Sequence, residues 1–154
     1  MKTIILYATK HGATAEIAQR IADKIGDATL HDLKQPTPDL AEYDCVIIGS
    51  AVYAGAFRKE GKAFLAQSSN ILKTKKLALF ASGMSKGESD KVFTENIPTE
   101  LLQEAKATML LGGVFDPKKA NFAERLIMKV VTKQSGYVDT IDNDKITEFA
   151  GALT

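Results

Sequence analysis

Four runs of the sequence are apolar almost without a break, and they constrain most strongly how the chain can fold. The runs are Thr3–Ala8, Cys45–Val52, Leu77–Ala81 and Thr108–Phe115. Strands of this composition are buried on both faces, as happens when helices cover both sides of a parallel sheet. A shorter alternating run, Ala28–Leu33, is predicted to be an edge strand. The chain is therefore predicted to fold as an α/β protein around five strands.

Helical patterns fill the connections between these runs. The clearest one places Ile17, Ile21 and Ile25 four residues apart and stops at Gly26, as helices commonly do. The predicted helices cover Thr14–Ile25, Gly61–Ser68, Pro98–Lys106, Ala120–Lys133 and Asp144–Leu153. Alternating strands and helices imply right-handed crossovers and a doubly wound parallel sheet, order 2-1-3-4-5, with helices on both faces. Ligands of such sheets bind beyond the carboxyl ends of the strands.

Composition limits the class of protein. The 154 residues fit a single domain, 1–154. The net charge of +1 gives no reason to expect a nucleic-acid partner. The single cysteine, Cys45, makes neither a disulfide framework nor a cysteine-built metal site. No run has the pattern of a secretory signal or the roughly 18 apolar residues of a membrane span, so we expect a cytoplasmic protein.

The loop between the first strand and the first helix, TKHGAT, is small and hydroxylated. Backbone N–H groups at a helix N-terminus bind phosphate through hydrogen bonds and the helix dipole. Thr9 and Thr14 can add hydroxyl donors, and Gly12 lets the backbone approach a ligand closely. The alternative is an ordinary N-cap turn in which Thr14 or Thr9 caps the helix.

Better-known phosphate and catalytic motifs do not fit the sequence. The loop has neither the G-x-x-x-x-G-K-[ST] of a P-loop nor the G-x-G-x-x-G of a dinucleotide site. A phospho-acceptor domain needs acidic residues at the ends of the first and third strands, where this chain has Tyr7-Ala8 and Gly49-Ser50. Residues 83–87 read G-x-S-x-G, but His11 and His31 both precede Ser85, so the chain order of a hydrolase triad cannot be built. The loop therefore suits a single phosphate without an obligatory metal.

The same loop, YATKHGATAEIA, resembles the flavodoxin signature around the phosphate of FMN. The positions that match it are Tyr7, Thr9, Gly12, Thr14 and Ala18. His11 replaces a usual threonine and Ala13 a usual asparagine, which removes two side-chain ligands but no backbone donor. The segment YDCVIIGSAVYAGAF is similar to the loop that packs on the flavin ring, and LALFASGMSKGES to the one that holds its pyrimidine edge.

Within that superfamily the chain most resembles the menaquinone-dependent protoporphyrinogen-oxidase branch. The likeness lies in IGSAVYAGAF and in NFAERLIMKVVTKQSGYVDT, the segment after the last core strand. It implies a flavodoxin-like fold over nearly the whole chain, FMN as the cofactor, and an FMN-dependent oxidoreductase activity. The flavin would carry the redox chemistry, so no catalytic side chain and no metal site are predicted.

The resemblance assigns three loops to the cofactor. In chain order the predicted FMN-binding residues are Thr9, Lys10, His11, Gly12, Ala13, Thr14, Ser50, Ala51, Val52, Tyr53, Ala54, Gly55, Ser82, Gly83 and Met84. The first loop would hold the phosphate through hydroxyls and backbone N–H groups. The second would pack on the flavin, with Tyr53 stacking on the ring, and the third would offer backbone contacts to it.

Each assignment has a simpler alternative. His11 could be an exposed loop side chain, and Tyr53 a partly exposed tyrosine at the end of a strand. The loop after Ala81 could be a plain strand–helix connection.

The predicted helix over residues 120–133 is basic and amphipathic. Phe122, Leu126 and Val130 share one face, and Arg125, Lys129 and Lys133 lie on another. Such a helix could rest on a membrane surface, but it more often packs its apolar face on the sheet. We therefore expect at most peripheral membrane contact.

Two redox roles and one non-redox role compete. An enzyme would oxidise a small-molecule substrate and pass electrons to a quinone-type acceptor, as the resemblance implies. A flavodoxin-type electron carrier would dock on a redox partner, and such carriers are typically acidic around the flavin. The near-neutral charge of this chain favours the enzyme. A fold that has lost its flavin and serves only in binding is the third alternative.

Overall fold

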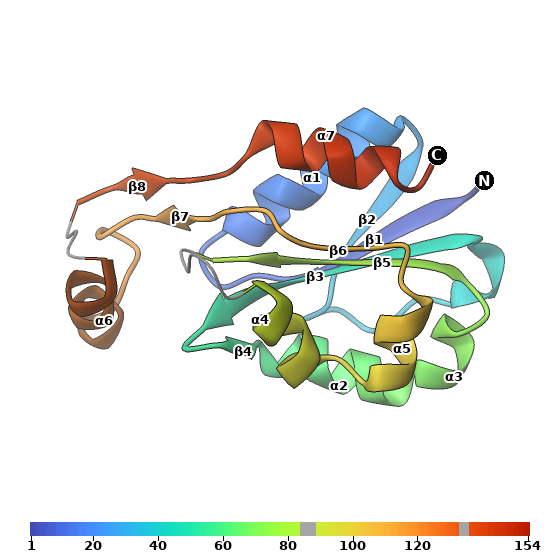
Figure 1. Ribbon diagram of the computed structural model, residues 1–154, viewed down its shortest axis with the longest axis horizontal. Coiled ribbons are helices and arrows are strands. Elements are labelled where there is room, and N and C mark those ends of the chain that lie inside the picture. The colour runs from blue at the N-terminus through green and yellow to red at the C-terminus, as the bar shows by residue number, and fades with distance from the viewer. Residues whose placement is uncertain (84–88, 133–135) are drawn as a thin grey trace.

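A central parallel sheet organises the computed structural model, which describes residues 1–83, 89–132 and 136–154 (Figure 1). Within these residues the parallel strands lie in the spatial order β2 (Ala28–Asp32), β1 (Thr3–Ala8), β3 (Cys45–Tyr53), β5 (Lys76–Ser82) and β6 (Ala107–Leu110). The short β4 (Ala56–Phe57) pairs with β3 in antiparallel fashion. When the five parallel strands are numbered in sequence order without β4, this is the predicted order 2-1-3-4-5, with β2 at the edge. The predicted fold is therefore confirmed.

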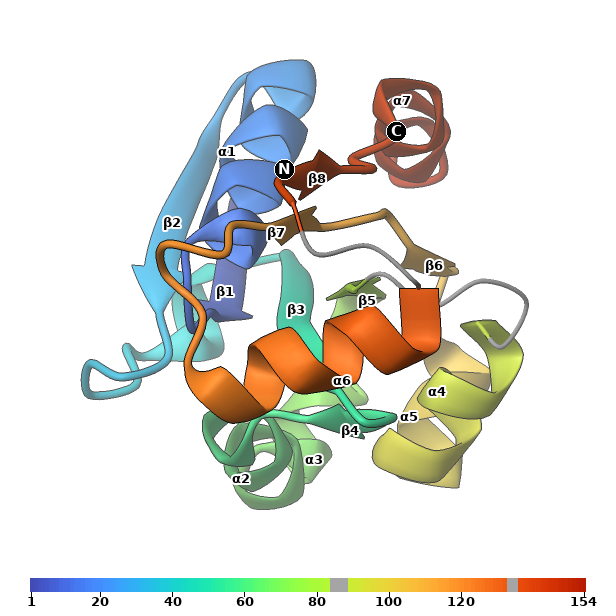
Figure 2. The ribbon, with the colours of Figure 1, turned by 90° about the vertical axis from the view of Figure 1, so that its left-hand side faces the viewer.

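Helices cover both faces of the sheet, as Figures 1 and 2 show. One face carries α1 (Ala13–Ile25) and α7 (Asn143–Gly151). The opposite face carries α2 (Lys59–Gln67), α3 (Ser69–Leu72), α4 (Ser89–Asn96) and α5 (Thr99–Glu104). Successive strand residues point to opposite faces, so in β1 Ile5 packs toward α1 and α7, while Ile4 and Leu6 pack toward the other layer.

The predicted helices are confirmed to within a few residues at their ends, but several short elements were not predicted. These are α3, α4, β4, β8 (Val138–Asp139) and a 3₁₀ turn over Leu40–Glu42. Each is too short to show a clear hydrophobic period in the sequence.

The predicted strand Thr108–Phe115 is wrong in its second half. β6 ends at Leu110, and the chain leaves the sheet to form β7 (Val114–Phe115), which pairs with β8 (Val138–Asp139). Gly112 permits this turn: its φ is +88°, and a Cβ there would collide with the carbonyl of Thr140. A run of apolar residues does not reveal such a break, because both halves remain apolar.

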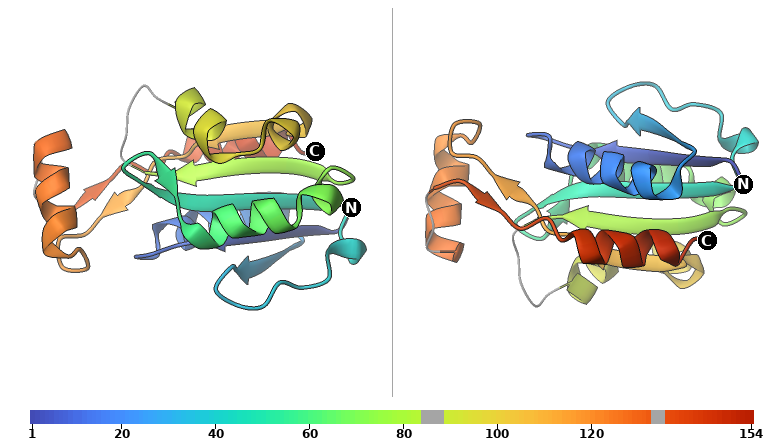
Figure 3. Two further views of the ribbon diagram at one scale, coloured as in Figure 1. Left: turned by 90° about the horizontal axis from the view of Figure 1, so that it is seen from below. Right: turned by 90° about the horizontal axis from the view of Figure 1, so that it is seen from above.

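The ribbon of β7 and β8 carries α6 (Phe122–Thr132) beyond the carboxyl ends of the strands (Figure 3). The expectation that this helix packs its apolar face on the sheet is wrong. Phe122, Leu126 and Val130 are 75%, 52% and 72% exposed, whereas Glu124 is buried. None of the helices in the described part of the chain is long and apolar enough to cross a membrane.

Candidate functional site

A cleft of about 460 Å³ opens at the carboxyl ends of the strands. Its walls come from the β1–α1 loop, the β3–β4 hairpin, the end of β5, α4, the segment from β6 to β7, and α6. The volume lies within the usual range for small-molecule and cofactor sites. A doubly wound sheet is expected to hold its ligand at this edge.

One end of the cleft is the N-terminus of α1. Gly12 occupies the N-cap position with φ +101°, and no side chain caps the helix. The Thr9 hydroxyl accepts a hydrogen bond of 3.0 Å from the Gly12 N–H. Gly12 precedes the first turn of α1, so this bond does not cap an N–H group of the helix. The alternative of an ordinary threonine N-cap is therefore not what the structure shows. A Cβ built on Gly12 would meet no atom within 4 Å, so the backbone borders open space.

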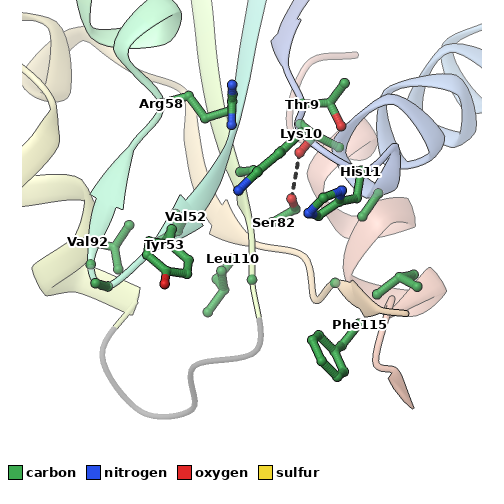
Figure 4. A pocket seen from close by; sticks show the side chains of 18 of the residues that line it. Thr9, Lys10, His11, Val52, Tyr53, Arg58, Ser82, Val92, Leu110 and Phe115 are labelled. Atoms are coloured by element: carbon green, nitrogen blue, oxygen red, sulfur yellow. Dashed lines mark hydrogen bonds between the residues drawn. The ribbon is translucent and has the colours of Figure 1, made fainter. Parts of the chain in front are cut away.

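Two buried hydroxyls support this end from below. Thr14 Oγ1 and Ser82 Oγ lie 2.7 Å apart and join the first turn of α1 to the end of β5 (Figure 4). A hydrogen bond between two hydroxyls uses one of their two protons. The second proton is left for another acceptor, and both residues line the cleft.

Two side chains of the β1–α1 loop reach across the cleft to α6. Lys10 Nζ lies 2.9 Å from one carboxylate oxygen of Glu124, and His11 Nε2 lies 3.0 Å from the other. A carboxylate can only accept, so His11 Nε2 carries the hydrogen in this contact. Glu124 also accepts from the Asn121 N–H at 3.2 Å, while Asn121 Oδ1 accepts from the Glu124 N–H at 2.8 Å, which makes a capping box.

The ionised form of Glu124 is favoured by these partners. Burial raises the pKa of its carboxyl, but hydrogen bonds from Lys10, the Asn121 N–H and His11 outweigh it, so the pKa is lowered. A carboxyl whose folded pKa is depressed stabilises the native contacts above its unfolded pKa of about 4.3. That stabilisation is lost as the pH falls through the pKa that Glu124 has in the folded protein, which is the lower of the two pKa values.

Acidification is therefore expected to loosen α6. The contribution should be about 1 kcal/mol, because Lys10 is nearly half exposed and solvent screens the pair. Protection of the α6 amides from hydrogen exchange, corrected for intrinsic rates, should fall over this acidic range. Glu124→Gln should show reduced protection already at neutral pH. Glu148→Gln, at an exposed position on α7, should behave as the unmodified chain; equal protection in both variants would contradict the prediction.

The other end of the cleft is wider and largely apolar. The β3–β4 hairpin turns at Ala54 and Gly55, whose φ angles are +51° and +79°. Positive φ at both positions of a two-residue loop is typical of a type I′ turn. The turn presents Tyr53, which is 47% exposed, to one side of the cleft (Figure 4).

Asn96 of α4 holds this hairpin in place. Its Oδ1 accepts from the Phe57 N–H at 2.9 Å, and its Nδ2 donates to the carbonyls of Gly55 at 2.8 Å and of Val92 at 2.7 Å. The sequence analysis missed this residue. No local pattern marks it, because its partners on the hairpin lie about 40 residues earlier in the chain.

Apolar side chains from four further elements complete the wide end. Val92 comes from α4, Leu110 from the end of β6, Phe115 from the end of β7, and Met128 from α6. Figure 4 shows Val92 on the Tyr53 side and Leu110 and Phe115 along the adjoining wall. None of them was predicted as a site residue, because the sequence analysis placed 108–115 in one strand and the apolar face of 120–133 on the sheet.

Most of the predicted site residues do meet at this cleft. Those that line it are Thr9, Lys10, His11, Ala13, Thr14, Ala51, Val52, Tyr53, Ala54, Gly55, Ser82 and Gly83. The Ser50 side chain is buried inside β3, where it accepts from the Arg58 N–H and donates to the Ala51 carbonyl. Met84, like the G-x-S-x-G segment, lies outside the described residues.

Known proteins of similar sequence or structure include a protoporphyrinogen IX dehydrogenase, flavodoxins and a flavoprotein bound to FMN. The chain is 23% identical over 149 residues to the protoporphyrinogen IX dehydrogenase [quinone] of Escherichia coli, a match covering 88% of this chain and 81% of that one. Flavodoxin 1 of Bacillus cereus superposes with a TM-score of 0.64 at 18% identity, covering 99% and 97% of the two chains. A Lactobacillus acidophilus flavoprotein in complex with FMN superposes with a TM-score of 0.57 at 21% identity, covering 71% and 92%.

The family assignment rests on a match to a family profile. The profile of the flavodoxin domain family matches residues 4–141, which cover the central sheet from the second residue of β1 onward and the residues that line the cleft. Together with the FMN-bound neighbour, it supports FMN as the cofactor, as the sequence predicted. This chain belongs to the flavodoxin domain family.

Proposed function

We propose that the cleft binds FMN and that the protein is an FMN-dependent oxidoreductase acting on a small molecule. The observation that carries this proposal is the division of the cleft into two unlike ends. One end is an uncapped helix N-terminus with buried hydroxyls, and the other is a wide apolar space bordered by Tyr53. A phosphate and a flat ring system joined in one ligand match these two ends.

The residues at the narrow end suit a phosphate monoester. The first turn of α1 begins at the cleft, where Ala13 and Thr14 line it and a Cβ on the neighbouring Gly12 would meet no atom within 4 Å. A helix N-terminus favours negative charge. Lys10 and His11 stand beside this space and add cationic or hydrogen-bonding character. The spare proton of the Thr14–Ser82 pair provides a further donor.

The residues at the wide end suit a flavin ring. Tyr53 can stack on one side of it, and Val52, Leu110 and Phe115 offer apolar contact. When bound, the flavin would supply the chemistry by accepting hydride or electrons. The chain itself would bind and orient the ring, exclude water from it and adjust its potential through backbone groups. No side chain is required to act as an acid or base.

The position of α6 favours an enzyme over an electron carrier. A carrier leaves its flavin edge exposed for a protein partner. In this structure α6 spans the mouth of the cleft and contributes Glu124 and Met128 to its lining. Among the described lining residues, Lys10, Arg58 and Lys91 stand against Glu95 and Glu124. A slightly basic cleft that is partly covered by a helix suits an anionic small molecule, such as a porphyrinogen with its carboxylates, and we propose a quinone-type electron acceptor.

FMN should bind at one-to-one stoichiometry and more tightly than riboflavin. The phosphate contacts at α1 are absent for riboflavin, and charge-assisted hydrogen bonds of this kind contribute about 1.5–3 kcal/mol each, so we expect a difference of roughly a hundredfold. Titration of the apoprotein by quenching of flavin fluorescence measures both constants. Equal affinity for the two flavins would contradict the phosphate assignment.

The same protein loaded with FMN tests the activity. We expect protoporphyrinogen IX to reduce the flavin under anaerobic conditions, and a soluble menaquinone analogue to reoxidise it, both followed by stopped-flow flavin absorbance. Absence of reduction by the porphyrinogen, together with fast and salt-sensitive electron exchange with a ferredoxin-type reductase, would identify a carrier instead.

A further inference from the structure

We propose that the outer face of α6 docks on an anionic lipid bilayer. By the outer face we mean Phe122, Leu126 and Val130 with Arg125 and Lys129 beside them. The apolar residues follow one another at four-residue intervals, so they form a continuous stripe along the helix. They are 75%, 52% and 72% exposed, although large apolar side chains in such a stripe are normally covered.

The basic side chains of α6 lie on its exposed side, and its acidic side chain lies on the side that faces the cleft. Arg125 and Lys129 are exposed, and the helical repeat places both along one flank of the apolar stripe. The acidic residue of this helix, Glu124, is turned inward onto Lys10 and His11. Lys118 and Lys119, just before the helix, are exposed as well. The outer face therefore combines apolar area with positive charge, which complements a bilayer surface rich in anionic headgroups.

The position of α6 at one end of the molecule suits contact with a flat bilayer surface better than contact with a second copy of the chain. The ribbon of β7 and β8 carries the helix past the ends of the strands, so its outer face is presented along its whole length at one end of the molecule (Figure 3). A helix of 11 residues is about 16 Å long and can lie within the headgroup region. Symmetric pairing of two such faces would bring the basic flanks of both copies into one interface, where they would repel each other.

Docking in this way would bring the cleft to the membrane. The inner side of α6 contributes Glu124 and Met128 to the cleft, so only the width of one helix, about 10 Å, would separate the site from lipid. This part of the inference rests on the proposed function: it identifies the electron acceptor as a quinone dissolved in the bilayer. The docking itself requires neither flavin nor turnover.

Flotation of the full chain with lipid vesicles tests the docking. We expect strong binding to phosphatidylcholine vesicles containing about one third phosphatidylglycerol, and weak binding to phosphatidylcholine alone. Leu126→Ser combined with Val130→Ser should reduce binding roughly tenfold or more, because it removes apolar area that the bilayer would bury. Arg125→Glu combined with Lys129→Glu should reduce it at least as much, and salt should weaken binding by the unmodified chain.

A matched control separates local docking from general charge attraction. Lys59→Glu combined with Lys62→Glu changes the net charge equally on exposed positions of α2, and it should leave vesicle binding nearly unchanged. An equal loss in this control, or no binding of the unmodified chain to anionic vesicles, would overturn the proposal. So would sedimentation showing that the outer face mediates self-association instead. FMN titration of the same samples reports separately on the proposed function.

Discussion

Gly12→Asp is expected to abolish tight FMN binding, with a loss on the order of a hundredfold or more, while the fold remains intact. Gly12 borders the open space in front of the α1 N-terminus, where we place the phosphate. An aspartate there would bring a negative charge beside a phosphate and take up its space. Aspartate tolerates positive φ better than most residues, so the backbone can keep its course. Fluorescence titration with FMN measures the loss.

Gly26→Asp is a matched control within the same helix. Gly26 lies at the opposite end of α1 with φ +99°, against +101° at Gly12, and a Cβ at either position meets no atom within 4 Å. Both substitutions place an aspartate at positive φ at one end of α1, but only Gly12 lies between residues that line the cleft, His11 and Ala13. Comparable FMN affinity in the two folded variants would move the phosphate site elsewhere.

Gly49→Ala is expected to have the largest effect on stability, about 3 kcal/mol. Gly49 lies in the middle of β3, and a Cβ there would collide with the ring of Phe80 on the neighbouring strand β5. Phe80 is fully buried and packs edge-to-face on Phe149 of α7, with ring centroids 6.0 Å apart. A shift of the Phe80 ring would therefore press on Phe149 and on the packing of α7 against the sheet. Urea denaturation measures the change in the free energy of unfolding.

Gly61→Ala provides the comparison. Gly61 is also buried, but the nearest atoms to a Cβ there are those of Ser50 at 3.5 Å, which is ordinary contact. Since alanine favours a helix over glycine by about 1 kcal/mol, this variant should be neutral or slightly stabilised. Phe80→Leu added to Gly49→Ala should recover part of the loss. If the double variant is no more stable than Gly49→Ala alone, a collision with the Phe80 ring does not cause the loss of stability.

Much of the fold could be predicted from the sequence, because parallel strands buried on both faces are apolar throughout. The order of the strands and the position of β2 at one edge of the sheet followed from right-handed crossovers between such strands. The observed sheet confirms both. The β1–α1 loop could be identified too, since its chemistry lies in consecutive residues. Its role in holding phosphate, like the other site assignments, stays a prediction.

Tertiary structure alone decided which elements close the cleft. Lys10 and Glu124 are 114 residues apart, and no periodicity links them. Asn96 reaches a hairpin 41 residues away by the same kind of contact.

For α6, the sequence determined an amphipathic helix, and the structure decided which way it faces. Hydrophobic periodicity shows that one side of a helix is apolar, but it does not show what covers that side. The turn at Gly112 takes the chain off the sheet, and β7 and β8 then carry the helix past the strand ends. There the polar partners Lys10 and His11 attract Glu124 inward, and the apolar stripe is left facing out.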